Sequence, residues 1–392
     1  MKILLIHNYY QQRGGEDNYF DSLARLLKRK GHSVYLFTKK SSEIKSFGHK
    51  MQTAIELHSN TQVLREISSI IDQFKPDIAH SQNILPSITK TAHYACKAKN
   101  VPVVHTIQSY RYLCPKGTLF LKEKTCEVCV MKKFSYPAIV HGCYHNSRLA
   151  SLALVSASFL SPALQQLALL GKIHFPSRFI QNYYIEHLNI APKKTFVVPN
   201  FVPPTINTHK PQMGNYFIFV GRLAEEKGIR DLIHAFSLLK DQQLIIIGDG
   251  PLKQYVISNK TQNVIYKGFM ERSEILSHMA SARATIVPSP WYEVCPTVIM
   301  ESFSSHTPVI APSYGVFPEL VTNNKTGYLY KHRDIQDLVR VVRFVSKQEE
   351  NKNVRKNCQI EYLRKYTDDA HYKKLIKAYQ SLLNQSTQLV DF

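Results

Sequence analysis

The sequence is poor in the features that define several classes of protein. Its 392 residues include 15 Gly and 19 Pro, too few for a collagen-like or low-complexity chain, and 7 Cys, too few for a disulfide-stapled miniprotein. Hydrophobic residues make up 44% of the chain, so it can bury sizeable cores. Its length predicts about two to three domains.

Long apolar runs are also scarce. Residues 3–6 are strongly apolar, but this run is too short for the core of a signal peptide. Residues 149–171 carry no charge, yet their serines, glutamines and Pro162 dilute the apolar surface. We therefore expect a helix packed on a core, or lying on a membrane surface, rather than a membrane span. Without a secretion signal, the odd number of Cys indicates a cytoplasmic protein.

Acidic residues are scarce in the first half of the chain. Residues 1–200 carry 26 Lys and Arg against 11 Asp and Glu, a net charge of +15, whereas residues 201–392 carry 24 against 18, a net charge of +6. The positive electrostatic potential of such a charge distribution attracts nucleic acid, an anionic membrane surface or a phosphorylated substrate. One hypothesis is peripheral attachment to the inner face of a membrane through the basic first half and the basic C-terminal helix. The alternative is ordinary solubilising charge.

Strands and helices are predicted to alternate in two successive series. The first series has strands at 2–7, 33–37, 77–80 and 101–105, with helices at about 17–30, 62–74 and 85–99. The second has strands at 216–220, 243–247, 264–266, 284–287 and 308–311, with a helix at 226–240. Such alternation is typical of parallel sheets covered on both faces, with ligands beyond the carboxyl ends of the strands.

The pattern predicts an α/β protein with two doubly wound domains facing each other across a cleft. The first domain spans residues 1–200 and includes a Cys-rich insertion at about 106–150. A linker covers residues 201–214, and the second domain spans residues 215–367. Residues 368–392 form a C-terminal helix, expected at about 368–387, that can pack back on the first domain.

Residues 221–228, GRLAEEKG, follow a predicted strand. Gly221 allows a sharp turn of the backbone. A forked guanidinium at Arg222 and an ammonium at Lys227 suit a diphosphate. Two solvated loop cations are the alternative interpretation.

Glu293 and Glu301 form a pair of carboxylates eight residues apart. Pro296 favours a helix that starts at Pro296 or Thr297, which places Glu301 on the same face as Thr297. The start of this helix could bind a phosphate, and Glu301 could accept hydrogen bonds from a ribose diol. A capped amphipathic helix with incidental acids is the alternative.

Gly14-Gly15 separates the first strand from the first helix. Two glycines let the backbone approach a phosphate or sugar at a helix N-terminus, although a plain flexible turn is equally consistent. The full G-x-G-x-x-G fingerprint is missing, so the sequence gives little support for dinucleotide binding.

Four of the seven cysteines, Cys114, Cys126, Cys129 and Cys143, lie within thirty residues with the spacing C-x11-C-x2-C-x13-C. Four thiolates can close a tetrahedral Zn site, which would be structural. Free thiols or a redox pair are the alternatives.

In their order along the chain, these motifs resemble those of the retaining glycosyltransferases of family 4, which have the GT-B fold. The resemblance covers nearly the whole chain and rests on Gly14-Gly15, Val-Pro-Asn at 198–200, Gly221-Arg222, Lys227-Gly228, residues 247–251, Gly268-Phe269 and residues 293–301. It implies a nucleotide-diphosphate sugar as donor and an acceptor hydroxyl on a saccharide or lipid-linked molecule, in bacterial polysaccharide or lipid-linked saccharide synthesis. It implies no metal in catalysis.

The resemblance also implies roles for individual residues. Arg222 and Lys227 would bind the diphosphate, Glu301 the ribose, and Glu293 the sugar hydroxyls. Further donor contacts would come from Gly14, Gly15, Gly221, Gly268, Phe269, Pro296, Thr297 and Val298. His105, at the carboxyl end of a first-domain strand, would approach the sugar and acceptor.

The sequence is also compatible with other functions. A sugar-nucleotide epimerase or hydrolase could use the same fold. A nucleic-acid binder built on a four-cysteine zinc ribbon would use the same positive charge, but it leaves the pair Glu293 and Glu301 unexplained. A non-catalytic homologue would not need the intact charged residues of the second domain.

Overall fold

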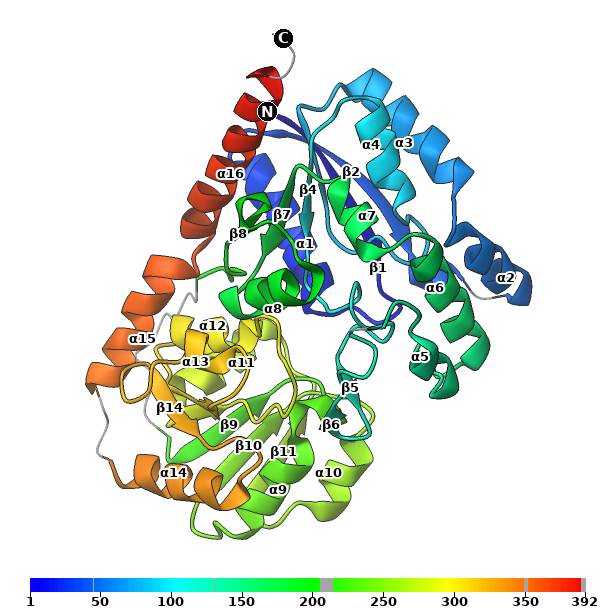
Figure 1. Cartoon of the computed structure of the whole chain (residues 1–392). Helices are drawn as coiled ribbons and strands as arrows, with labels where there is room; N and C mark the ends of the chain where they lie inside the picture. The colour runs from blue at the N-terminus through cyan, green and yellow to red at the C-terminus, as the bar shows by residue number, and fades with distance from the viewer. Residues whose placement is uncertain (45, 131, 205–213, 349–351, 389–392) are drawn as a thin grey trace. The chain divides into compact units, whose positions relative to one another are not determined.

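The computed structural model describes residues 1–44, 46–130, 132–204, 214–348 and 352–388 (Figure 1). The chain divides into two compact units. The first comprises Met1–Leu119, Cys126–Pro199 and His371–Phe392, and the second comprises Phe120–Thr125 and Asn200–Ala370. Of the predicted linker, residues 205–213 lie outside the described part of the chain.

The first unit contains a parallel sheet of six strands in the order β2-β1-β3-β4-β7-β8. Its strands are β1 (Lys2–Tyr9), β2 (Ser33–Lys40), β3 (Ile78–Ser81), β4 (Val103–Thr106), β7 (Lys172–Phe175) and β8 (Thr195–Val197). Its helices are α1 (Gly15–Arg29), α2 (Phe47–Glu56), α3 (Thr61–Phe74), α4 (Thr91–Ala98), α5 (Tyr136–Val140), α6 (Arg148–Leu160), α7 (Ala163–Ala168) and α8 (Arg178–Leu188).

The second unit repeats this plan, with the strand order β11-β10-β9-β12-β13-β14. Its strands are β9 (Tyr216–Val220), β10 (Gln243–Ile247), β11 (Val264–Gly268), β12 (Ala284–Ile286), β13 (Val309–Pro312) and β14 (Gly327–Tyr330). Its helices are α9 (Ile229–Ser237), α10 (Lys253–Asn259), α11 (Arg272–Ser281), α12 (Thr297–Ser304), α13 (Phe317–Leu320), α14 (Ile335–Lys347) and α15 (Lys352–Lys365). The predicted doubly wound α/β architecture is therefore confirmed.

Apolar periodicity explains why these segments form these elements. Residues 3–6 of β1 are fully buried because helices cover both faces of the sheet. In α1 the buried residues Phe20, Leu23 and Leu27 lie on one face of the helix. Gly31 follows the helix with φ +81°, a left-handed conformation that glycine adopts without strain.

Several short elements were not predicted. The strands β7, β8 and β14 have only three or four residues each, and they pair in parallel with β4, β7 and β13, respectively. The helix expected at 85–99 begins only at Thr91, and the one expected at 226–240 splits into a 3-10 turn at Glu225–Lys227 and α9. Residues 149–171 form α6 and α7, which are separated at Ser161 and Pro162. None of the described helices has the length and apolar character needed to cross a membrane.

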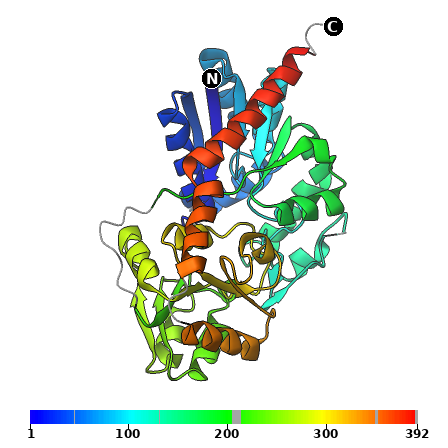
Figure 2. The ribbon, with the colours of Figure 1, turned by 90° about the vertical axis from the view of Figure 1, so that its left-hand side faces the viewer.

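The long C-terminal helix α16 (Asp368–Gln388) runs along the first unit (Figure 2). The Nδ1 atom of His371 lies 2.8 Å from the carbonyl oxygen of Pro199, and its Nε2 atom lies 3.0 Å from the hydroxyl of Tyr19. Further along α16, the Tyr379 hydroxyl is hydrogen-bonded to Nδ1 of His80 on β3. Buried polar contacts therefore hold this helix in the first unit.

A hairpin formed by β5 (Phe120–Leu121) and β6 (Lys124–Thr125) groups with the second unit. The Thr125 hydroxyl lies 3.1 Å from that of Tyr314, and Arg333 donates a hydrogen bond to the carbonyl of Glu123. The sequence predicts that the whole insertion at 106–150 belongs to the first domain, so the grouping of this hairpin with the second unit differs from the expectation.

Candidate functional site

The strand order of the second sheet reverses between β9 and β12, which are neighbours although they are distant in sequence. In open parallel sheets, the loops after two such strands diverge and leave a binding crevice at the carboxyl edge. The loop after β9 carries Gly221, Arg222 and Lys227, and the loop after β12 carries Glu293. Both charged motifs predicted from the sequence therefore meet at one edge of the sheet.

Lys227 and Glu293 are in direct contact. The Nζ atom of Lys227 lies 2.5 Å from Oε1 of Glu293, and the Ser289 hydroxyl donates to the same oxygen at 2.9 Å. The Glu293 side chain is buried, while that of Lys227 is 26% exposed and lies over the ring of Trp291. A buried carboxylate thus fixes an ammonium group that solvent, or a ligand, can still reach.

Arg222 is not part of this pair. Its side chain is largely exposed and its guanidinium is paired with Glu226, one turn further along the same loop. Arg222 therefore lies on the predicted loop, but the structure does not bring it to Glu293.

Close backbone packing shapes the same edge. A Cβ on Gly228, which has φ +69°, would lie 2.1 Å from the carbonyl oxygen of Pro288. A Cβ on Gly248 would lie 1.9 Å from the carbonyl oxygen of Gly221. The Gly248 N–H in turn donates to the carbonyl of Gly268 at 2.8 Å. Glycine is required at these positions because the loops pass backbone to backbone.

Helix α12 begins at Thr297 with Pro296 as its N-cap residue, as predicted. Glu301 lies one turn into the helix with its side chain 22% exposed, and Oε1 is 3.4 Å from Nε of Arg272. Burial raises the pKa of Glu301, and the nearby Arg272 opposes that shift. Thr297 and Val298 in the first turn are partly exposed, whereas Phe269, after β11, has a side chain that is 75% exposed.

The first sheet has its own reversal of strand order, between β1 and β3. Gly14 is the N-cap residue of α1 and Gly15 its first residue. No described atom outside the chain neighbours lies within 4 Å of where a Cβ on either glycine would be. The backbone at this helix start is therefore open, and donor binding by Gly14 and Gly15 stays a prediction.

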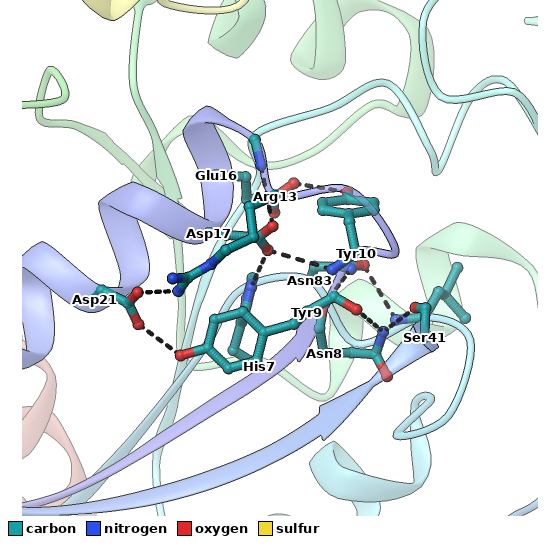
Figure 3. Close-up of polar contacts among 12 residues, drawn as sticks. His7, Asn8, Tyr9, Tyr10, Arg13, Glu16, Asp17, Asp21, Ser41 and Asn83 are labelled. Atoms are coloured by element: carbon teal, nitrogen blue, oxygen red, sulfur yellow. Dashed lines mark hydrogen bonds and ion pairs between the residues drawn. The ribbon is translucent and has the colours of Figure 1, made fainter. Parts of the chain in front are cut away.

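A polar cluster behind these glycines was not predicted (Figure 3). Oδ1 of Asp17 lies 2.8 Å from Nε2 of the fully buried His7, and Oδ2 accepts from the Gly14 N–H at 3.2 Å. The Tyr10 hydroxyl donates to Glu16 at 2.7 Å. Burial raises the pKa of Glu16, while the nearby His7, the hydrogen bond from Tyr10 and the positive charge of Arg111 oppose that shift.

A cavity of about 250 Å³ lies at the same edge of the first sheet. Its polar lining includes Glu16, Gln82, His105 and Arg111. Gln82 directly follows β3 and is only 1% exposed, yet no described residue hydrogen-bonds to the oxygen or nitrogen of its side-chain amide. Buried polar groups usually have partners, so Gln82 is the strongest sign that this cavity receives a polar ligand.

His105 lies near the end of β4 and lines this cavity, where the sequence analysis expected it. Its Nδ1 atom is 2.8 Å from the Ser81 hydroxyl, and its Nε2 atom is 3.1 Å from the Tyr112 hydroxyl. Burial, together with the nearby His93 and His80, lowers the pKa of His105 well below its usual range. A neutral ring with both nitrogens occupied is suited to positioning Tyr112 rather than to exchanging protons.

The four clustered cysteines are close enough to influence one another. Burial, together with the nearby Cys114, Cys143 and Cys126, raises the pKa of the Cys129 thiol to about 11. However, no three His, Cys, Asp or Glu side chains among the described residues are grouped so as to hold a metal ion. The Zn site at Cys114, Cys126, Cys129 and Cys143 therefore stays a prediction.

The fold, together with the charged residues at the carboxyl edge of the second sheet, indicates the class of the protein. Two family models match the chain, one described as "Glycosyl transferases group 1" over residues 206–365 and one as "Glycosyltransferase Family 4" over residues 13–125. Together they match well over half of its length. The chain belongs to glycosyltransferase family 4 and has the GT-B fold.

Individual relatives agree with this assignment. The chain is 24% identical to the sulfoquinovosyl transferase SQD2 of Arabidopsis thaliana, over 90% of this chain and 68% of that protein. It is 28% identical to the putative colanic acid biosynthesis glycosyltransferase WcaL of Salmonella typhimurium, over 50% of this chain and about half (52%) of the relative. Among solved structures, Anabaena HepE in complex with UDP-glucose matches 97% of this chain and 100% of its own with a TM-score of 0.65, at 15% identity.

Proposed function

We propose that this glycosyltransferase moves a hexose from a nucleotide-diphosphate sugar to an acceptor hydroxyl with retention of anomeric configuration. The process served would be the synthesis of a bacterial polysaccharide or a lipid-linked saccharide. The observation that carries the proposal is the contact between Lys227 and Glu293 at the carboxyl edge of the second sheet, with Glu301 one turn into α12. The nucleotide sugar bound by HepE and the polysaccharide named for WcaL support it.

In the proposed mechanism, the donor binds at the edge of the second sheet. Lys227, assisted by Arg222, holds the diphosphate, Glu293 contacts sugar hydroxyls and Glu301 binds the ribose. When the bond from the anomeric carbon to the phosphate oxygen breaks, the sugar becomes cation-like and the diphosphate gains negative charge. A fixed ammonium and the backbone N–H groups of Thr297 and Val298, which follow Pro296 at the start of α12, stabilise that charge more in the transition state than in the ground state.

The acceptor oxygen then forms its bond to the anomeric carbon, and its proton passes to an oxygen of the departing phosphate. Protein cations carry the charge of the leaving group, so the proposal needs no catalytic metal. We assign acceptor binding to the cavity of the first unit, where Gln82 offers an unused amide and His105 positions Tyr112. Chelation should leave the transfer rate unchanged even if Zn is bound at the cysteines.

A thermal-shift screen of nucleotide sugars tests the donor assignment. The true donor should raise the melting temperature because it binds only the native state. Glu301→Ala should abolish this shift, whereas Glu361→Ala, which removes a carboxylate from α15, should preserve it. Analysis of the product by NMR then reports the anomeric configuration. Product formed without any acceptor would instead indicate a hydrolase or an epimerase.

A further inference from the structure

Helices α5, α6 and α7 of the first unit expose an unusual number of large apolar side chains. Tyr136 and Val140 on α5, and Leu149, Leu152, Phe159 and Leu160 on α6, are between 45% and 79% exposed. With 100° per residue, the four residues on α6 lie within an arc of about 100°. This stripe points away from Leu154 and Ala157, which pack against Leu57 of the unit's own core.

The exposed apolar side chains of the two helices form a continuous surface. The ring of Phe134, just before α5, contacts that of Phe159 on α6 with ring centroids 5.5 Å apart. The ammonium of Lys132 lies 5.2 Å from the ring centroid of Tyr136. We call the exposed side of α5, α6 and α7 the α5–α7 surface. Figure 1 shows these three helices in the first unit.

Charge distinguishes this surface from an ordinary protein interface. No Asp or Glu occurs between Glu127 and Glu186 in the sequence. Within that stretch Lys132, Lys133 and Arg148 are all exposed. Apolar and aromatic side chains beside cations, without acids, match an anionic bilayer, where the apolar groups enter the acyl boundary and the cations meet lipid phosphates.

We propose that the α5–α7 surface docks the protein on an anionic membrane surface. This assigns membrane attachment to one face of the first unit, whereas the sequence alone suggested the basic first half as a whole together with the basic C-terminal helix. The helices lie on the surface and do not span it, because α5, α6 and α7 have at most 13 residues each.

Flotation of the full-length protein with vesicles tests the proposal. The vesicles contain phosphatidylcholine alone or phosphatidylcholine with phosphatidylglycerol. We expect binding to the mixed vesicles at low salt, and weaker binding to phosphatidylcholine alone. Leu149→Ser/Phe159→Ser/Leu160→Ser should reduce binding to the mixed vesicles at least about tenfold. Lys132→Ala/Lys133→Ala should reduce binding and make it less sensitive to salt.

The matched control is Phe344→Ser/Ile360→Ser/Leu363→Ser, which removes three comparably exposed apolar side chains from α14 and α15. This variant should bind vesicles like the wild type. Equal loss in both triple variants, equal binding to both vesicle types, or no binding at all would overturn the proposal. A wild-type dimer that the first triple variant converts to a monomer would also overturn it, because a second copy would then cover the surface. No donor or acceptor is present, so failure here leaves the proposed sugar transfer untouched.

Discussion

At the carboxyl edge of the second sheet the polar groups are charged and partly open to solvent, whereas at the same edge of the first sheet many are neutral and buried. Lys227 is paired with Glu293 and remains accessible. His105, by contrast, is buried and hydrogen-bonded on both nitrogens, and the Gln82 amide has no partner among the described residues. A charged, accessible edge suits a diphosphate, and a pocket that holds the side-chain amide of Gln82, unpaired within the described residues, beside Glu16 and Arg111 suits the hydroxyl groups of a sugar. The contrast therefore supports the proposal that donor and acceptor bind to different units.

The largest expected effect concerns the charged edge. Lys227→Ala should lower kcat by about 10² to 10³, which corresponds to about 3–4 kcal/mol of barrier, because a fixed cation at the leaving group is lost. The measurement is the initial rate with the donor identified by thermal shift. Lys365→Ala is the control, since Lys365 forms a similar 2.5 Å pair with Glu361 at 32% exposure. Equal rates in the two variants would remove Lys227 from the mechanism.

The second prediction compares a tightly packed glycine of the second unit with a glycine of the first unit that has free space around it. Gly248→Ala should lower the free energy of unfolding by about 2–3 kcal/mol, because its Cβ would meet the carbonyl of Gly221 at 1.9 Å. Gly14→Ala should change it by less than about 0.5 kcal/mol, since Gly14 has φ −131° and open space beside it. Chemical denaturation measures both. If Gly248→Ala were as stable as the wild type, the loops at the carboxyl edge of the second sheet could not be packed this tightly.

The third prediction uses the buried histidines of the first unit. Burial lowers the pKa of His174 to about 4 and that of His371 to about 3. The unfolded chain has a value near 6.5, so it binds more protons below that pH and stability is lost as the pH falls toward 4. One such histidine accounts for about 2 kcal/mol between pH 7 and pH 5.

Denaturation at pH 5 and at pH 8 measures this slope. His174→Asn should make the dependence shallower, while His234→Asn, which alters an exposed histidine of the second unit, should leave it unchanged. A protein as stable at pH 5 as at pH 8 would contradict the neutral, buried state of these rings.

The two sheet edges also differ in how much of each could be predicted from the sequence. The loop with Lys227 and the pair Glu293 and Glu301 could be recognised because their strand, turn and helix context is local, and α12 starts where Pro296 predicted. Gln82 and His174 gave no local signal, because their surroundings come from segments far apart in sequence. The contact of His371 with Tyr19, for example, joins residues 352 positions apart. Gln82 could have been flagged only by its place directly after a buried strand at the edge where β1 and β3 diverge.

The smallest expected effect concerns Gln82, and it tests whether the cavity at the carboxyl edge of the first sheet binds a ligand. Gln82→Leu removes a buried amide that has no partner in the described structure, so the free energy of unfolding should stay unchanged or rise by up to about 1 kcal/mol. Asn83→Leu, its neighbour in the same cavity, should instead destabilise the protein, because the Asn83 side chain donates to the Asn8 carbonyl at 2.6 Å and accepts from the Leu85 N–H at 3.2 Å. If the Gln82 amide binds an acceptor hydroxyl, Gln82→Leu should raise the acceptor KM about tenfold, with little change in the donor KM. An unchanged acceptor KM would reduce the cavity to a packing defect, and would leave the charged edge of the second sheet as the one assigned site.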